Sequence, residues 1–221
     1  MKKASLKRKL KRIPAFFKRI GLHNKNFTII SNNCWGGGIY DLYALRYNTP
    51  TIGLYFMSYD YIKFLKNLDE YLKNELIQVK WSDTPFRNEF FQQKDVYKNS
   101  LNKELDDLVI AKLSDIYIIF LHYDTFEEAK DKWNRRVKRI NKENMVVKFN
   151  DQNEFKKEYF DLFDKLSYKH KIFYTGDKTI KSQYGTKVIY LNEPYIKNKV
   201  VLTDMIYSKQ NFNLKQYLNE L

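Results

Sequence analysis

The sequence contains a single cysteine, Cys34, among its 221 residues. One cysteine excludes an internal disulfide framework and any cysteine-rich zinc or iron–sulfur site, which is typical of proteins in a reducing compartment. No stretch approaches the roughly 18 uncharged apolar residues that a membrane-spanning helix needs. Lysines and arginines also interrupt the N-terminus, where a signal peptide would be apolar. These absences predict a cytoplasmic protein that is neither exported nor integral to a membrane.

Acidic residues are absent from residues 1–20, which hold nine of the 40 lysines and arginines. The remainder of the chain therefore carries 31 basic and 26 acidic residues, and most of the formal net charge of +14 comes from the N-terminal segment. Because the rest of the chain is only mildly basic, its charge does not predict nucleic-acid binding.

The apolar residues of the N-terminal segment recur at the spacing of an α-helix, with basic residues between them: Leu6, Leu10, Ile13, Phe17 and Ile20. Pro14 lies inside this pattern and should break or kink the helix. A basic amphipathic arm over residues 1–22 is typical of proteins that attach to an anionic membrane, here the inner face of the plasma membrane. A solvated arm, or a helix packed on its own domain, is the alternative.

From residue 27 onward, short β-branched and aromatic runs alternate with stretches of helical periodicity. Strands are predicted at 27–31, 51–57, 76–80, 108–112, 116–121, 145–149, 171–175 and 187–191, and helices at 39–46, 61–72, 126–141, 154–166 and 214–221. This alternation predicts an α/β fold with a mostly parallel, open sheet and flanking helices. Residues 23–221 are predicted to form a single α/β domain, with a smaller C-terminal part from about residue 145 as the alternative.

Polar and ionisable residues follow many of the predicted strands, at 32–38, 58–60, 122–124, 150–151 and 175–177. In an open parallel sheet, ligands bind beyond the carboxyl ends of the strands. Asp60 and Tyr123 are therefore candidate ligand-binding residues. The three histidines are scattered without metal-ligand spacing, so no metal site is predicted.

Three consecutive glycines follow Cys34 and precede a predicted helix. The amides of Gly36 and Gly37 could hold an oxyanion or a phosphate, because a helix N-terminus favours negative charge. The same position should lower the pKa of a thiol and make it more nucleophilic. The amide side chains of Asn32 and Asn33 could add oxyanion donors. Alternatively, Cys34 is a small buried residue in a turn that needs glycine for steric reasons.

His122 directly follows a buried strand, and a capped helix begins nearby at Thr125. It could act as a general base, although a core histidine bonded to the backbone is the alternative. If Cys34 and His122 both follow parallel strands, they should face one another across the same rim of the sheet. On the helix after Thr125, Arg135 and Arg139 are i, i+4 neighbours that could bind a phosphate, or simply form a solvated face.

Four segments and several single residues form a distinctive combination: Ser31–Gly37, Thr49–Leu54, Leu121–Tyr123 and Phe126–Ala129, with Trp133, Arg136, Arg139, Ile140 and Asn141. This combination resembles a bacterial family of unknown function whose members are described as exopolysaccharide biosynthesis proteins, over about residues 25–215. The resemblance implies a role in capsule or exopolysaccharide assembly, without a reaction.

A strand followed by an Asn-Cys turn is also similar to the opening of capsule acetyltransferases with a Gly-Asn-Cys turn, whose distant esterase-like fold has a cysteine and a histidine in the site. By this resemblance Cys34 corresponds to their cysteine and Asn33 to their asparagine, whereas Asn32 replaces their glycine. His122 is assigned by its position alone.

The leading hypothesis is an acyltransferase of the O-acetyltransferase type. It would move an acyl group from acetyl-coenzyme A to a saccharide or sugar-lipid of a nascent surface polysaccharide. Cys34 would be the nucleophile or an oxyanion-site residue, and His122 the general base. One alternative is a sugar or phosphoryl transferase whose Arg135 and Arg139 hold the diphosphate of a nucleotide- or lipid-linked sugar. Another is a non-catalytic binding protein of the assembly machinery.

Overall fold

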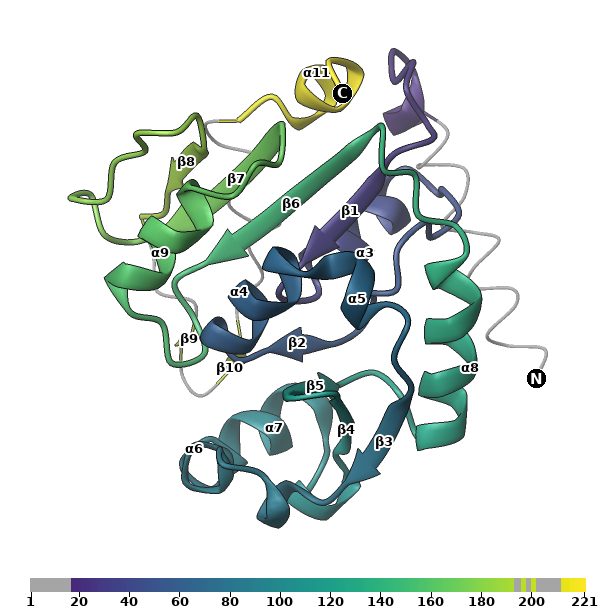
Figure 1. Ribbon diagram of the computed structural model, residues 1–221, viewed down its shortest axis with the longest axis vertical. Coiled ribbons are helices and arrows are strands. Elements are labelled where there is room, and N and C mark those ends of the chain that lie inside the picture. The colour runs from purple at the N-terminus through teal and green to yellow at the C-terminus, as the bar shows by residue number, and fades with distance from the viewer. Residues whose placement is uncertain (1–16, 193–195, 198–199, 202–211) are drawn as a thin grey trace.

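A computed structural model describes residues 17–192, 196–197, 200–201 and 212–221. Four parallel strands form its first sheet, in the order β1-β6-β7-β8 (Figure 1). They are β1 (Thr28–Ser31), β6 (Met145–Asn150), β7 (His170–Thr175) and β8 (Lys187–Tyr190). The alternative boundary near residue 145 thus falls at the start of a strand that pairs with β1.

The second sheet is antiparallel, with strand order β2-β5-β4-β3. Its strands are β2 (Tyr55–Phe56), β3 (Leu76–Val79), β4 (Val109–Leu113) and β5 (Ile116–Phe120). The prediction of a mostly parallel sheet therefore holds only for the first sheet. Two residues, Ser114 and Asp115, join β4 to β5, and Ser114 adopts a φ of 57°. So short a link permits a hairpin but no crossover to a parallel strand.

Helices cover both sheets, and a short antiparallel pair, β9 (Ile196–Lys197) and β10 (Val200–Val201), follows β8. The helices are α3 (Trp35–Leu42), α4 (Ser58–Lys66), α5 (Leu68–Tyr71), α6 (Arg87–Gln92), α7 (Lys94–Leu101), α8 (Phe126–Val137), α9 (Lys157–Asp164) and α11 (Leu214–Asn219), with 3-10 turns at Trp81–Asp83 and Leu105–Asp107. Within the described ranges, no helix has the length and apolar character to cross a membrane.

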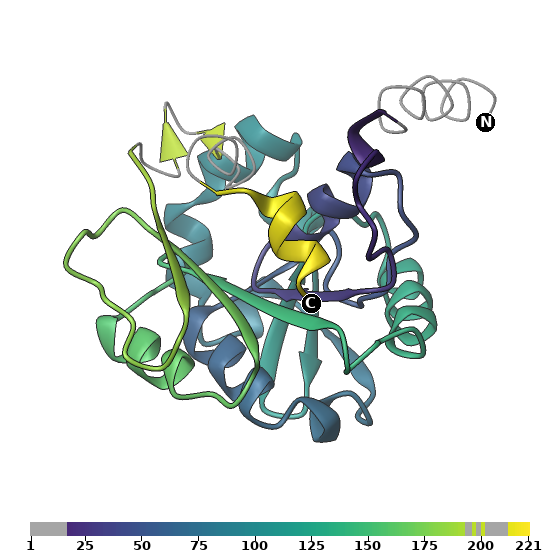
Figure 2. The ribbon, with the colours of Figure 1, turned by 90° about the horizontal axis from the view of Figure 1, so that it is seen from above.

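The main core lies between the two sheets. Ile30, Val147 and Phe149 of the parallel sheet pack there with α4, α8, α9 and one face of the antiparallel sheet. The other face of the parallel sheet packs against α3 and α11, and Figure 2 shows α11 lying across it. A third apolar cluster joins the far face of the antiparallel sheet to α6 and α7. Each sheet thus has apolar side chains packed against both of its faces.

Helix α8 matches its prediction closely at its start and less closely at its end. Thr125 Oγ1 accepts a hydrogen bond from the Glu128 amide at 3.2 Å, as expected of an N-cap. Ala129 and Trp133 lie on the buried face. The helix ends at Val137, a few residues earlier than predicted.

Helix α3 begins at Trp35, four residues before the predicted start, so the three glycines lie inside the helix. A Cβ atom on Gly36 would lie 2.9 Å from Ser31 Oγ and 3.0 Å from Ile29 Cγ2. Gly36 is therefore required for the close packing of α3 on β1.

Most of the predicted N-terminal arm, including Leu6, Leu10 and Ile13, lies outside the described residues. Of the part that is described, Phe17 is 64% exposed and Ile20 is 61% exposed, whereas Leu22 is buried in the core. The side chain of Asn219 on α11 holds this end of the chain through hydrogen bonds to the His23 amide and the Gly21 carbonyl, each 2.8 Å long.

Candidate functional site

The turn between β1 and α3 is held by a dense polar network. Asn32 Nδ2 donates to Asn150 Oδ1 at 2.6 Å, and Ser31 Oγ accepts from the Gly36 amide at 3.2 Å. Asn33 Oδ1 accepts from the Trp35 amide at 3.1 Å. The predicted oxyanion donors Asn32 and Gly36 are thus already bonded within the fold, which argues against that role for them.

Lys148 is the residue of this network that the sequence analysis missed. Its side chain is fully buried, and Nζ donates to Asn33 Oδ1 at 3.1 Å and to Asn32 Oδ1 at 3.4 Å. Nζ also lies 5.5 Å from the centroid of the Tyr174 ring. The signal was a lysine inside the otherwise apolar strand β6, because such a residue is almost never fully buried unless it has partners.

Cys34 and His122 both contact the segment that precedes β2. Cys34 Sγ lies 3.8 Å from the Leu54 carbonyl oxygen, and the His122 amide donates to the Gly53 carbonyl at 3.1 Å. Gly53 has a φ of +68°, and a Cβ atom there would lie 3.2 Å from both His122 Cβ and Tyr123 Cε2. The two predicted catalytic residues thus share adjacent neighbours, while a direct contact between thiol and imidazole stays a prediction.

The prediction that Cys34 and His122 both follow parallel strands of one sheet was wrong. Cys34 is the N-cap residue of α3 and follows the parallel strand β1, but His122 follows the antiparallel strand β5. The two residues approach because the Asn32 carbonyl accepts from the Phe56 amide at 3.0 Å, which joins the end of β1 to β2. The site therefore lies where the two sheets meet.

The ring of His122 is suited to accept a proton. Burial lowers its pKa below the ordinary value, and the charge of Lys103 lowers the pKa further. The imidazole should therefore be neutral near pH 7, as a general base must be.

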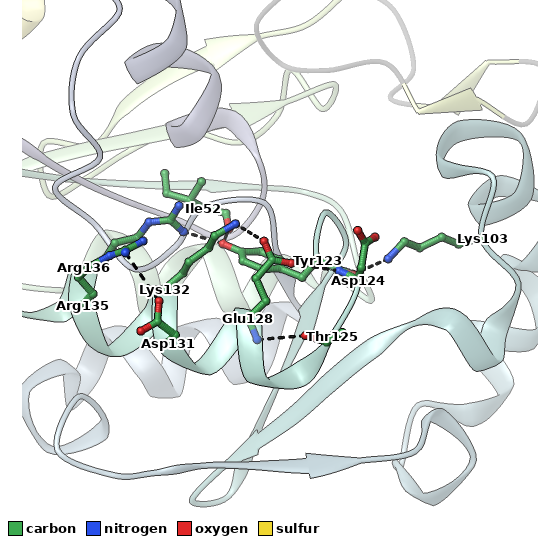
Figure 3. Close-up of polar contacts among 10 residues, drawn as sticks. All are labelled: Ile52, Lys103, Tyr123, Asp124, Thr125, Glu128, Asp131, Lys132, Arg135 and Arg136. Carbon is green, nitrogen blue, oxygen red and sulfur yellow. Dashed lines mark hydrogen bonds and ion pairs between the residues drawn. The ribbon is translucent and has the colours of Figure 1, made fainter. Parts of the chain in front are cut away.

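Tyr123 is the centre of a second network next to this segment. Its hydroxyl donates to the Ile52 carbonyl at 2.6 Å and accepts from Arg136 Nη1 at 2.6 Å (Figure 3). Burial raises the pKa of Tyr123, so the hydroxyl keeps its proton. Arg136 is 6% exposed. It appeared in the resemblance but was not predicted as a site residue.

The remaining predicted residues lie elsewhere or are engaged. Asp60 is buried in α4, where it accepts from the Tyr117 amide at 2.9 Å and pairs with Lys63 at 3.2 Å, so it lies toward the opposite end of β5 from His122. Arg135 lies 3.7 Å from Asp131 (Figure 3).

The last two predicted site residues are Gly37, in α3, and Arg139, just after α8. A Cβ atom added at Gly37 would lie 3.5 Å from Ile52 Cγ2, an ordinary contact distance. Arg139 Nη1 donates to the Tyr47 carbonyl at 3.3 Å. Within the described ranges, no three His, Cys, Asp or Glu side chains gather in a way that could hold a metal ion.

Comparison with known proteins gives two matches. Residues 5–220 match the family described as "Domain of unknown function (DUF1919)". A protein of Haemophilus influenzae (strain KW20 / Rd), which carries the name "Uncharacterized protein", is 30% identical over 169 residues. The aligned region is 75% of this chain and 70% of that protein.

Proposed function

Since this chain belongs to the family described as "Domain of unknown function (DUF1919)", whose description names no reaction, we propose a reaction from the site itself. The proposed activity is acyl transfer from a thioester donor, such as acetyl-coenzyme A, to a sugar hydroxyl. Cys34 carries the acyl group, and His122 acts as the general base.

In the first step, the proton of the Cys34 thiol passes to His122, the resulting thiolate attacks the donor carbonyl to form a new thioester on Cys34, and the departing donor sulfur takes this proton and leaves as a thiol. In the second step, a sugar hydroxyl attacks this thioester while His122 takes the hydroxyl proton. The sugar ester is released, and the proton returns to the departing Cys34 sulfur. Each step exchanges one acyl bond for another, so no oxidant or reductant is needed.

One observation carries this proposal: the Cys34 thiol and the His122 backbone contact the adjacent residues Leu54 and Gly53. Cys34 is also the N-cap residue of α3, where the helix dipole favours a thiolate. The lowered pKa of His122 supplies a neutral base at the pH of the cytoplasm. Together these features support a cysteine nucleophile with a nearby base.

The acceptor and location rest on the sequence. The resemblance to exopolysaccharide biosynthesis proteins supports a sugar of a capsule or exopolysaccharide as acceptor. The basic segment of residues 1–22 supports attachment to the inner face of the plasma membrane. Deleting residues 1–22 should abolish sedimentation with anionic vesicles at low salt, and equal sedimentation of both proteins would exclude this attachment.

A sugar or phosphoryl transferase is the second candidate, because several arginines gather beside the Tyr123 network. The third is a non-catalytic binding protein. To separate them, the purified protein is incubated with acetyl-coenzyme A or with nucleotide sugars, and the released products are measured. Free coenzyme A released by the wild type but not by Cys34→Ala supports acyl transfer. Release of nucleoside diphosphate supports the second candidate, and binding without release supports the third.

A further inference from the structure

Arg136 is a buried cation held by uncharged groups. Its Nη1 atom donates to the Tyr123 hydroxyl at 2.6 Å, and its guanidinium carbon lies 5.0 Å from the centroid of the Tyr47 ring. Tyr123 is fixed in turn by its bond to the Ile52 carbonyl (Figure 3). The guanidinium is thus positioned rigidly, at one end of the segment that Cys34 and His122 also contact.

Within the described part of the chain, no carboxylate lies within 4.0 Å of the Arg136 guanidinium. The nearby acids on α8 have other partners. Glu128 pairs with Lys132, although the charge of Arg136 also helps to lower the pKa of Glu128. Asp131 lies 3.7 Å from Arg135. A buried charge is normally paired, because removing it from water is costly. Among the described residues, Arg136 therefore has no carboxylate in direct contact, and the nearby Glu128 is shared with Lys132.

A second arginine, Arg139, lies close to Arg136. Burial lowers the pKa of Arg139, and so do the charges of Arg46, Arg135 and Arg136, which places these three guanidinium groups within electrostatic reach of Arg139. Arg139 Nη1 bonds to the carbonyl of Tyr47, the residue whose ring covers Arg136. Arginines from the loop after α3 and from the end of α8 thus converge, although like charges repel.

We propose that Arg136, with Arg46, Arg135 and Arg139 around it, forms a binding site for a phosphate or diphosphate group. Guanidinium groups form paired, charge-assisted hydrogen bonds with phosphate oxygens. A dianion or trianion would relieve the repulsion among the four arginines and neutralise the buried one. Coenzyme A and nucleotide sugars both carry a diphosphate, so the site could hold the donor of the transfer reaction. That assignment rests on the proposed function.

Calorimetric titration with inorganic pyrophosphate at low salt tests the anion site without any turnover. We expect the double substitution Arg46→Gln with Arg139→Gln to weaken binding by about tenfold or more. Arg136→Lys should also weaken it, because an ammonium cannot form the paired contact. The matched control is Lys169→Gln with Lys187→Gln, which removes the same charge from exposed positions at the far edge of the parallel sheet. It should leave the affinity within about twofold of wild type.

Separate titrations with coenzyme A and uridine diphosphate distinguish a coenzyme A donor from a nucleotide-sugar donor. The compound that represents the natural donor should bind more tightly. Equal weakening by both double substitutions, or no pyrophosphate binding to the wild type, would overturn the proposal. Cys34→Ala should bind pyrophosphate like the wild type. If it does and no acyl group reaches Cys34 in the wild type, the acyl-transfer proposal fails while the anion site stands.

Discussion

Two buried polar clusters of this protein are built in opposite ways. Asp164, at the end of α9, is 3% exposed, and its carboxylate accepts hydrogen bonds of 2.6–3.3 Å from the loop of residues 182–186. The donors are Ser182 Oγ, Gln183 N, Tyr184 N, Thr186 N and Thr186 Oγ1. Burial raises the pKa of Asp164, but these bonds together outweigh burial and lower it. This cluster is complete without a ligand.

The Arg136 cluster is incomplete by comparison. Arg136 is almost as buried as Asp164, yet its described contacts are a tyrosine hydroxyl and a tyrosine ring, and its charge acts on Arg139 together with those of Arg46 and Arg135. A buried charge is normally paired with an opposite charge, and no described carboxylate lies within ion-pair distance of Arg136. The Asp164 cluster thus has the saturated hydrogen bonding of a group that holds the fold, whereas the Arg136 cluster leaves room for the proposed phosphate.

The largest expected effect is at the saturated cluster. Asp164→Ala should lower the free energy of unfolding by about 3 kcal/mol or more, because several buried donors lose their acceptor. Urea denaturation near pH 7 measures this. Asp161→Ala, an exposed position on the same helix, is the control and should change stability by less than about 0.5 kcal/mol. Similar effects of the two substitutions would remove the distinction between the clusters.

The same cluster predicts a pH dependence. Because the folded state lowers the pKa of Asp164, this carboxylate stabilises the fold at pH values above its ordinary pKa of about 3.9. The stabilisation is lost as the pH falls through the lowered folded pKa. The stability difference between wild type and Asp164→Ala should therefore shrink below about pH 4. A difference that stays constant from pH 7 to pH 3 would contradict this account.

The location of Asp164 at a helix end was predictable, but its partners were not. Local periodicity placed β5 and the start of α8 correctly, since the spacing of Trp133 and the cap at Thr125 depend only on nearby residues. The loop that satisfies Asp164 begins 18 residues later, beyond β7. Strand pairing had a local signal that was overlooked, because the three residues between the predicted strands 108–112 and 116–121 are already too few for a crossover between parallel strands.

The candidate site was predictable in its chain positions and not in its contacts. Cys34 and His122 were selected because they follow strands, but their common neighbour, Gly53–Leu54, depends on how two sheets meet. Arg136 was not predicted as a site residue, because only the tertiary structure buries it against Tyr123. Lys148 could have been found, since a charged residue interrupts an apolar strand there.

At the proposed active site, next to the Arg136 cluster, His122→Gln should lower the rate of acyl transfer by about 100-fold or more, the usual contribution of a general base. The wild-type rate should stay constant above about pH 6.5 and fall as the pH drops through the lowered pKa of His122, because only the neutral ring accepts a proton. Rates measured from pH 5 to pH 8 test this. The acid limb should be absent from the His122→Gln profile, and an unchanged limb would assign it to another group.

The turn that carries Cys34 allows a smaller, internally controlled test. Gly36→Ala should destabilise the protein by about 1–3 kcal/mol, since the added methyl group would meet Ser31 and Ile29 at 3.0 Å or less. Gly37→Ala places its methyl group at 3.5 Å from Ile52, an ordinary contact, and should be neutral or stabilise α3 by up to about 1 kcal/mol. Thermal unfolding of both variants would show whether α3 packs on β1 as described. Equal stability of the two would contradict that packing.

If Cys34 carries the acyl group, that group can be trapped on its sulfur, and trapping it is the most direct test of the proposed reaction. Wild-type protein is mixed with acetyl-coenzyme A without acceptor, quenched in acid, digested and analysed by mass spectrometry. We predict an acetyl thioester on the peptide that contains Cys34, formed more slowly in His122→Gln and removed by hydroxylamine. Release of coenzyme A with no acetyl group on Cys34, or undiminished release by Cys34→Ala, would contradict the claim.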